Sequence, residues 1–205
     1  VGAYLQGVDG GTVSNNNFGN FTVTDASNVS GVWFATGTVN STISGNTITN
    51  LVGAAIGAPR GIAVSSAYPN ANINITGNTI SNISCGYSAP PYGIYVFSTT
   101  SGISIKKNKI SGLLNTSASG YGARGINVAT TVSPANIDIV NNFVWNIAAT
   151  ADASVTYWGI GIAIDATINT VNVYFNSVNL YGTLAGYSSA TVHTAFYVSS
   201  GATLL

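Results

Sequence analysis

The fold is decided by residues 75–83, Ile75-Thr76-Gly77-Asn78-Thr79-Ile80-Ser81-Asn82-Ile83, because the chain repeats this stretch at nearly constant intervals. Residues 43–51 are a close copy, and residues 13–21, 105–113, 139–147 and 173–181 are looser ones. The central asparagine recurs at Asn16, Asn46, Asn78, Asn108, Asn142 and Asn176. Successive members are 30, 32, 30, 34 and 34 residues apart, and self-similarity at such a period is typical of a solenoid.

A second repeated element precedes each copy and reads glycine, apolar residue, any residue, apolar residue. Gly61-Ile62-Ala63-Val64 is one example. The other copies begin at residues 2, 31, 93, 125 and 159, and an alanine version begins at residue 195. For the copy at 159 we read Gly159-Ile160-Gly161-Ile162 as the element.

Both elements alternate apolar and polar residues with a period of two, which is typical of half-buried strands. Neither a 3.6-residue period nor helix-capping signals accompany them. We therefore predict an all-β fold: a right-handed parallel β-helix, or β-solenoid, of six full coils of about 30–34 residues plus part of a seventh. The right hand follows from the usual preference of parallel crossovers. Residues 1–205 form one domain, which we expect to be a fragment of, or a subunit in, a longer stack.

The central asparagines allow two interpretations. In the first they form a structural ladder at a bend, where asparagine tolerates the left-handed conformation and each amide bonds to the asparagines above and below. In the second they form a row of amides that binds a ligand. We favour the ladder, because each asparagine lies between two inward apolar positions.

The residue before each repeated glycine forms a further column. Its members are Ser30, Arg60, Tyr92, Arg124, Trp158 and Thr194. Coils stack about 4.8 Å apart, so arginines and aromatic rings alternate along the solenoid. One interpretation is a cation–π ladder that holds this face together. The other is a glycan-binding strip, in which aromatic rings stack on sugars and arginine donates to hydroxyls, with Arg60, Tyr92, Arg124 and Trp158 as binding residues.

Composition limits the possible partners. Five Lys and Arg residues balance five Asp residues, and the chain contains no Glu. A nucleic-acid partner is not expected, because phosphate binding needs many basic residues. The long uncharged runs are rich in Asn, Ser, Thr and Gly, so we predict no insertion into a membrane. A single cysteine excludes intrachain disulfides. The composition favours an extracellular or cell-surface location.

The combined pattern Gly-Ile-x-Val followed by Ile-x-Ile-x-x-Asn-x-Ile-x-Asn-Ile resembles the right-handed parallel β-helix repeats of the pectin-lyase-like superfamily. It is similar, more narrowly, to Asn- and Thr-rich repeat regions of large secreted surface proteins of Bacteroidetes-type bacteria. The closest stretches are residues 93–96 and 171–176. The resemblance covers nearly the whole chain and implies the architecture. It implies no particular activity, because one fold hosts many functions.

Pectate lyases and polygalacturonases on this fold use clustered Asp residues with Arg or Lys on one face, so the acidic residues test that possibility. They are Asp9, Asp25, Asp138, Asp152 and Asp165. Glycoside hydrolysis needs two carboxyl groups about 5–10 Å apart. No two of these residues align in adjacent coils, so we predict no catalytic residue, no metal site and no cofactor.

These observations lead to three hypotheses for function. The first is a non-enzymatic structural repeat protein that forms a surface stalk, or a fibre that self-associates through coil stacking. Its partners are then other copies or flanking repeats. The second is a glycan-binding adhesin module that uses the aromatic and arginine face. The third is a polysaccharide lyase or hydrolase whose catalytic residues lie in coils outside this sequence.

Overall fold

The computed structural model describes residues 1–25, 27–149, 159–165, 170–180 and 193–199 of the chain. In these residues every regular element is a strand, and the strands form three parallel sheets. Sheet 1 contains β1 (Ala3–Leu5), β4 (Ser30–Phe34), β7 (Arg60–Val64), β10 (Tyr92–Ser98), β13 (Ala123–Thr130), β16 (Gly159–Ile164) and β19 (Thr194–Val198).

Each coil continues from sheet 1 into the other two sheets. Sheet 2 contains β2 (Thr12–Ser14), β5 (Thr42–Ser44), β8 (Ile73–Thr76), β11 (Ile103–Lys106), β14 (Ile137–Val140) and β17 (Val171–Tyr174). Sheet 3 contains β3 (Asn17–Val23), β6 (Thr47–Gly53), β9 (Thr79–Cys85), β12 (Lys109–Asn115), β15 (Phe143–Ala149) and β18 (Ser177–Asn179). Equivalent strands of successive coils pair in every sheet, which confirms the parallel β-solenoid.

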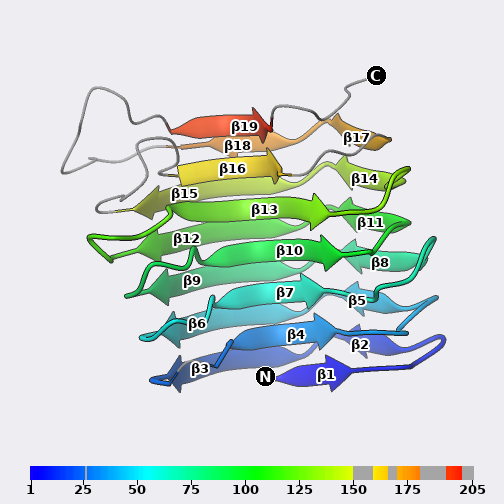
Figure 1. The fold of residues 1–205 in the computed structure, drawn as a ribbon, viewed down its shortest axis with the longest axis horizontal. Coiled ribbons are helices and arrows are strands. Elements are labelled where there is room, and N and C mark those ends of the chain that lie inside the picture. The colour runs from blue at the N-terminus through cyan, green and yellow to red at the C-terminus, as the bar shows by residue number, and fades with distance from the viewer. Residues whose placement is uncertain (26, 150–158, 166–169, 181–192, 200–205) are drawn as a thin grey trace.

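The winding of the solenoid is right-handed (Figure 1). Strands of sheet 1 run from left to right across the front of the view, and strands of the other sheets return behind them. The chain climbs from β1 at the bottom to β19 at the top. The described residues make about five turns, slightly fewer than the six full coils expected. Parts of the last coils lie outside the described residues. No helix in the described part of the chain is long and apolar enough to cross a membrane.

The interior consists of stacked apolar columns. In sheet 2, Ile43 pairs with Ile75, and Ile75 with Ile105. In sheet 3, Ile48 pairs with Ile80 in the same way. These five side chains are completely buried. Each buried Ile contributes roughly 1.5–3 kcal/mol relative to an exposed one, but only because the coils above and below cover it.

The repeated glycine near the start of the strands from β4 to β16 is required by close packing. A Cβ atom at Gly93 would lie 2.5 Å from the carbonyl oxygen of Gly125 and 2.5 Å from Cγ2 of Ile110. Real Cβ atoms do not approach other atoms so closely. The glycine therefore allows sheet 1 to pack directly on the side chains of sheet 3.

The register of the sixth coil corrects one prediction. The sequence suggested Gly159-Ile160-Gly161-Ile162 as its repeated element. Instead Ile126 pairs with Ile162 and Val128 with Ile164, so the element begins two residues later, at Gly161. Gly-Ile-Gly-Ile satisfies the pattern at either position. A two-residue shift also keeps the same side chains pointing inward, so alternation alone does not distinguish the registers.

The position of the left-handed residues corrects a second prediction. The ladder asparagines were expected to adopt positive φ, but the residue before each one does. Their φ angles lie between 54° and 67°. These residues are Asn15, Gly45, Gly77, Lys107, Asn141 and Phe175. The bend is therefore made one residue earlier, which leaves the asparagine side chain free to point inward.

Candidate functional site

The asparagine ladder runs through all six predicted positions. Nδ2 of Asn46 donates to Oδ1 of Asn78 at 3.0 Å, and Nδ2 of Asn78 donates to Oδ1 of Asn108 at 3.0 Å. The backbone N–H of each donor residue reaches the same oxygen, also at 3.0 Å. Equivalent bonds join Asn16 to Asn46, Asn108 to Asn142 and Asn142 to Asn176.

From Asn46 to Asn176, each amide nitrogen of the ladder also donates to the coil below. Nδ2 of Asn78 donates to the backbone oxygen of Ile43, in the coil below, at 3.0 Å. Asn78 and Asn108 are completely buried. Buried amides that use their donors and acceptors on one another stabilise a fold and have nothing left for a ligand. The structural interpretation of the ladder therefore holds for its interior members.

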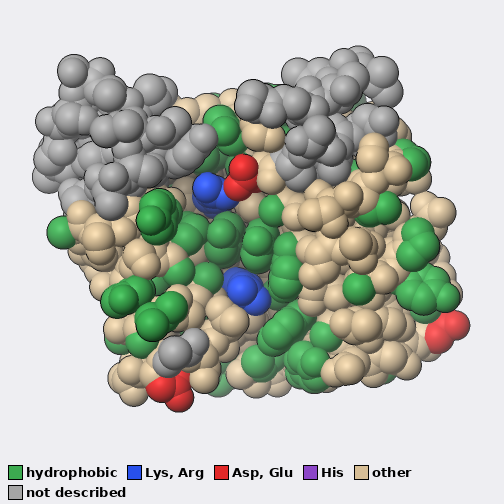
Figure 2. All heavy atoms as spheres, viewed as in Figure 1, with side chains coloured by type: hydrophobic (Ala, Val, Ile, Leu, Met, Phe, Trp, Pro, Cys, Tyr) green, Lys and Arg blue, Asp and Glu red, His purple; other side chains and the backbone are tan. Residues whose placement is uncertain are grey.

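The second candidate site is the outer face of sheet 1. Figure 2 shows basic side chains set among hydrophobic ones on this face. The predicted column is present in its first four members, because Ser30 pairs with Arg60, Arg60 with Tyr92, and Tyr92 with Arg124. The next position is occupied by Ile160, as the shifted register of the sixth coil requires. Trp158 lies outside the described residues.

The arginine–aromatic cluster is defined here by Trp33, Arg60, Tyr92, Tyr95 and Phe97. The Arg60 guanidinium carbon lies 5.9 Å from the ring centroid of Trp33, 5.4 Å from that of Tyr95 and 5.0 Å from that of Phe97. Tyr92 stacks on Tyr95 at 4.2 Å, and Tyr95 stacks on Phe97 at 4.6 Å. The cation–π contacts of Arg60 are therefore made with Trp33, Tyr95 and Phe97, while its column neighbour Tyr92, the partner in the predicted ladder, joins the cluster by stacking on Tyr95.

Burial changes the ionisation of this cluster. Burial raises the pKa of Tyr92 to about 12, although the positive charge of Arg124 acts in the opposite direction. Burial also lowers the pKa of the Arg60 guanidinium, against the opposing influence of Tyr95 and Tyr92. Nε of Arg60 is buried and has no hydrogen-bond partner, whereas one terminal nitrogen donates to Oδ1 of Asn28 at 3.3 Å.

Arg124 has a different environment from Arg60. It forms an ion pair with Asp165 and donates to Oδ1 of Asn127 at 3.1 Å. This ion pair was not predicted, because the register expected for the sixth coil places Asp165 two residues further along the sheet from Arg124. Phe97 was also missed, although its position two residues after Tyr95 places it on the same face of a strand.

Two of the described acidic residues, Asp138 and Asp165, form ion pairs with basic side chains. Asp138 lies beside Ser104 and Asn172 in the adjacent coils. Its carboxylate lies 3.4 Å from Nζ of Lys106 and accepts a hydrogen bond from Asn172. The described residues also contain no group of three metal-ligating side chains. Asp152 lies outside them.

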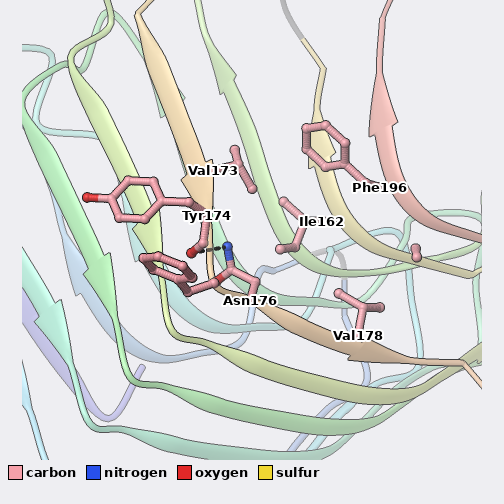
Figure 3. A pocket seen from close by; sticks show the side chains of 8 residues that line it. Ile162, Val173, Tyr174, Asn176, Val178 and Phe196 are labelled. Carbon is pink, nitrogen blue, oxygen red and sulfur yellow. Dashed lines mark hydrogen bonds between the residues drawn. The ribbon is translucent and has the colours of Figure 1, made fainter.

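A cavity of about 340 Å³ lies at the upper end of the described solenoid (Figure 3). Its wall includes Ile162, Val173, Val178 and Phe196, which come from sheets 1, 2 and 3. These residues continue the interior columns. Ile139 and Val144, one coil below Val173 and Val178, are completely buried. The cavity is thus part of the solenoid core that the described residues do not cover.

Comparisons with protein-family models, with curated proteins and with solved structures found no match.

Proposed function

We propose that the chain is a non-enzymatic, extracellular structural repeat protein whose stacked coils form a surface stalk or the body of a self-associating fibre. The observation that carries this proposal is the unbroken asparagine ladder. It commits the buried side chains of Asn46, Asn78, Asn108 and Asn142 to bonds between coils. Three parallel sheets add backbone hydrogen bonds in the same direction. Such a molecule is stiff along its axis, because every coil is bonded to the next.

Cell labelling tests the location and the form of the protein. Antibodies raised against the 205-residue chain are applied to intact and to lysed cells of the source organism, followed by immunogold electron microscopy. We expect labelled projections or fibres on intact cells. Labelling that requires lysis would contradict the proposal.

An activity screen tests the non-enzymatic part of the proposal. The chain is incubated with pectin, alginate and similar polymers, and reducing ends and unsaturated products are measured. No turnover is expected. Turnover that persists after repeated purification would favour the lyase or hydrolase hypothesis instead.

Glycan binding at the arginine–aromatic cluster is a second candidate function. It is supported by the partly exposed rings of Trp33, Tyr95 and Phe97, which lie around the Arg60 guanidinium on the outer face of sheet 1 and could stack on a sugar. Arg60→Gln and, as a control, Lys107→Gln are compared with the unsubstituted chain on a glycan array. Loss of binding in Arg60→Gln alone supports this function. Unchanged binding, or no binding by the unsubstituted chain, removes it.

A further inference from the structure

The outer edge between sheets 2 and 3 gathers most of the basic residues of the chain. Lys106 ends β11, Lys107 makes the bend with a φ of 57°, and Lys109 begins β12. They are three of the five Lys and Arg residues in the sequence. Asn108 points inward between the last two and is completely buried, whereas Lys107 and Lys109 are exposed. The two exposed lysines therefore project from a convex edge of the solenoid.

The positive charge of this edge is only partly neutralised. Nζ of Lys106 lies 3.4 Å from the carboxylate of Asp138. Within the described residues neither Lys107 nor Lys109 forms an ion pair. Three lysines and one aspartate thus leave two positive charges here, although the formal net charge of the whole chain is zero. Such an edge attracts an anionic partner.

Exposed aromatic rings continue the same edge in the next coil. Phe143 pairs with Lys109 of the coil below and is 42% exposed. Trp145 is partly exposed and stacks on Phe143, with 4.4 Å between the ring centroids. A large apolar surface that stays in contact with water beside unpaired cations indicates a site of interaction.

The bend position carries a further ring one coil higher. Phe175, two coils above Lys107, occupies the equivalent position and is 78% exposed. Lys107 and Asn141 at this position are also exposed, although each has another coil above it. Exposure at the bend therefore comes from the outward direction of the side chain. We call the set Lys107, Lys109, Phe143, Trp145 and Phe175 the lysine–aromatic edge.

We propose that the lysine–aromatic edge docks on the surface of a membrane that contains anionic lipids. Its two lysines face the lipid phosphates, and its three rings enter the boundary between headgroups and acyl chains, where aromatic side chains accumulate. A nucleic acid would require more cations than these two. A pocket for a sugar is concave, whereas this edge is convex. The inference is independent of the stalk or fibre form, because the edge runs along the side of the coils.

Co-sedimentation with vesicles tests the docking. The full chain is mixed with vesicles of phosphatidylcholine alone, or of phosphatidylcholine with an equal amount of phosphatidylglycerol. We expect binding to the anionic vesicles that weakens at high salt, because exposed charges are screened, and little binding to the neutral ones. Tryptophan emission should shift to shorter wavelength on binding, and Trp145→Ser, which copies Ser111 of the coil below, should remove that shift. No binding to anionic vesicles, or equal binding to both kinds, would overturn the proposal.

Substitutions that copy neighbouring coils test the lysines without disturbing the fold. Lys107→Asn introduces the residue found at Asn141, and Lys109→Thr introduces the residue found at Thr79. Together they should weaken binding to anionic vesicles on the order of thirtyfold, since each lysine near an anionic surface contributes separately. Tyr68→Ser removes a ring that is 54% exposed, in the segment between β7 and β8, and is the control. Circular dichroism checks the fold of each variant.

Two results would overturn docking on lipid. One is unchanged vesicle binding by the double lysine variant, or an equal loss of binding in Tyr68→Ser. The other involves immobilised alginate, a soluble acidic polysaccharide. Binding to alginate that the double lysine variant loses, without binding to anionic vesicles, would assign the lysine–aromatic edge to an acidic polysaccharide instead.

Discussion

At the scale of single residues, the ladder places asparagine side chains in the core, where burial of an amide is unfavourable unless the amide is hydrogen-bonded. An amide in the core loses its bonds to water, and the loss is offset only if donors and acceptors are paired. Asn78 satisfies this condition with its neighbours Asn46 and Asn108 and with the backbone of Ile43. The hydrogen bonds of the asparagine at this position therefore hold each coil in register over the next.

Removal of one interior ladder residue should destabilise the protein strongly. Asn78→Ala removes bonds to both neighbours and leaves buried donors and an acceptor unpaired. The free energy of unfolding should fall by about 3 kcal/mol, measured by chemical denaturation. Asn16→Ala, at the half-solvated end of the ladder, should cost about 1 kcal/mol. Equal losses in the two variants would contradict a cooperative interior ladder.

Burial of Tyr92 should make stability depend on alkaline pH. Its pKa is raised by burial to about 12 in the folded chain, whereas the ordinary pKa of a tyrosine, which applies in the unfolded chain, is 10.0. The folded state then binds the proton more tightly. The stabilisation is therefore fully present below pH 10 and is lost as the pH rises from about 10 through 12, by about 2–3 kcal/mol. Denaturation at several pH values measures this loss, and Tyr92→Phe should remove the part that Tyr92 contributes.

At the scale of secondary-structure elements, strands of sheet 1 depend on the glycine that lets them approach sheet 3. The sequence marked these glycines by their regular recurrence. It did not give the reason, because the close approach of Gly93 to Gly125 and Ile110 exists only in the stacked coils. The sequence also left the sixth coil ambiguous between two registers, since both place isoleucines inward.

A single methyl group at this contact should be poorly tolerated. Gly93→Ala should lower the free energy of unfolding by about 2–4 kcal/mol, because the new Cβ atom has no space. Gly86→Ala provides a matched control, since the nearest atom to its Cβ would be 3.8 Å away. Its melting temperature should stay close to that of the unsubstituted chain. A comparable loss in both variants would contradict the steric explanation.

At the scale of the whole molecule, stability is distributed over nearly equivalent interfaces. Each coil contacts the coils above and below through the same columns, so no coil has a hydrophobic core of its own. The same property means that a whole coil can be removed without changing the type of contact that its neighbours make. A partial coil cannot be removed in this way, because strands of different sheets would then be stacked.

Deletion of one complete coil should preserve the fold. Removal of residues 61–92 joins Arg60 to Gly93, so that Asn46 becomes the neighbour of Asn108 in the ladder. The shortened chain should keep its β-sheet circular dichroism and a cooperative melting transition. Removal of residues 61–76, about half a coil, should abolish both. A folded half-coil deletion, or an unfolded whole-coil deletion, would contradict the equivalence of the coils.

The sequence by itself determined the parallel solenoid, its inward columns outside the sixth coil, and the partners of each ladder asparagine. It could do so because a stacked repeat converts a distance along the chain into vertical contact, and the interval can be read directly. Tertiary structure alone decided the register of the sixth coil, the ion pair between Arg124 and Asp165, the mutual stacking of Tyr92, Tyr95 and Phe97, and the cavity at the upper end. These features depend on which of several residues that fit the repeat equally well come into contact, and on which surfaces the neighbouring coil leaves uncovered. The spacing of the repeat specifies neither.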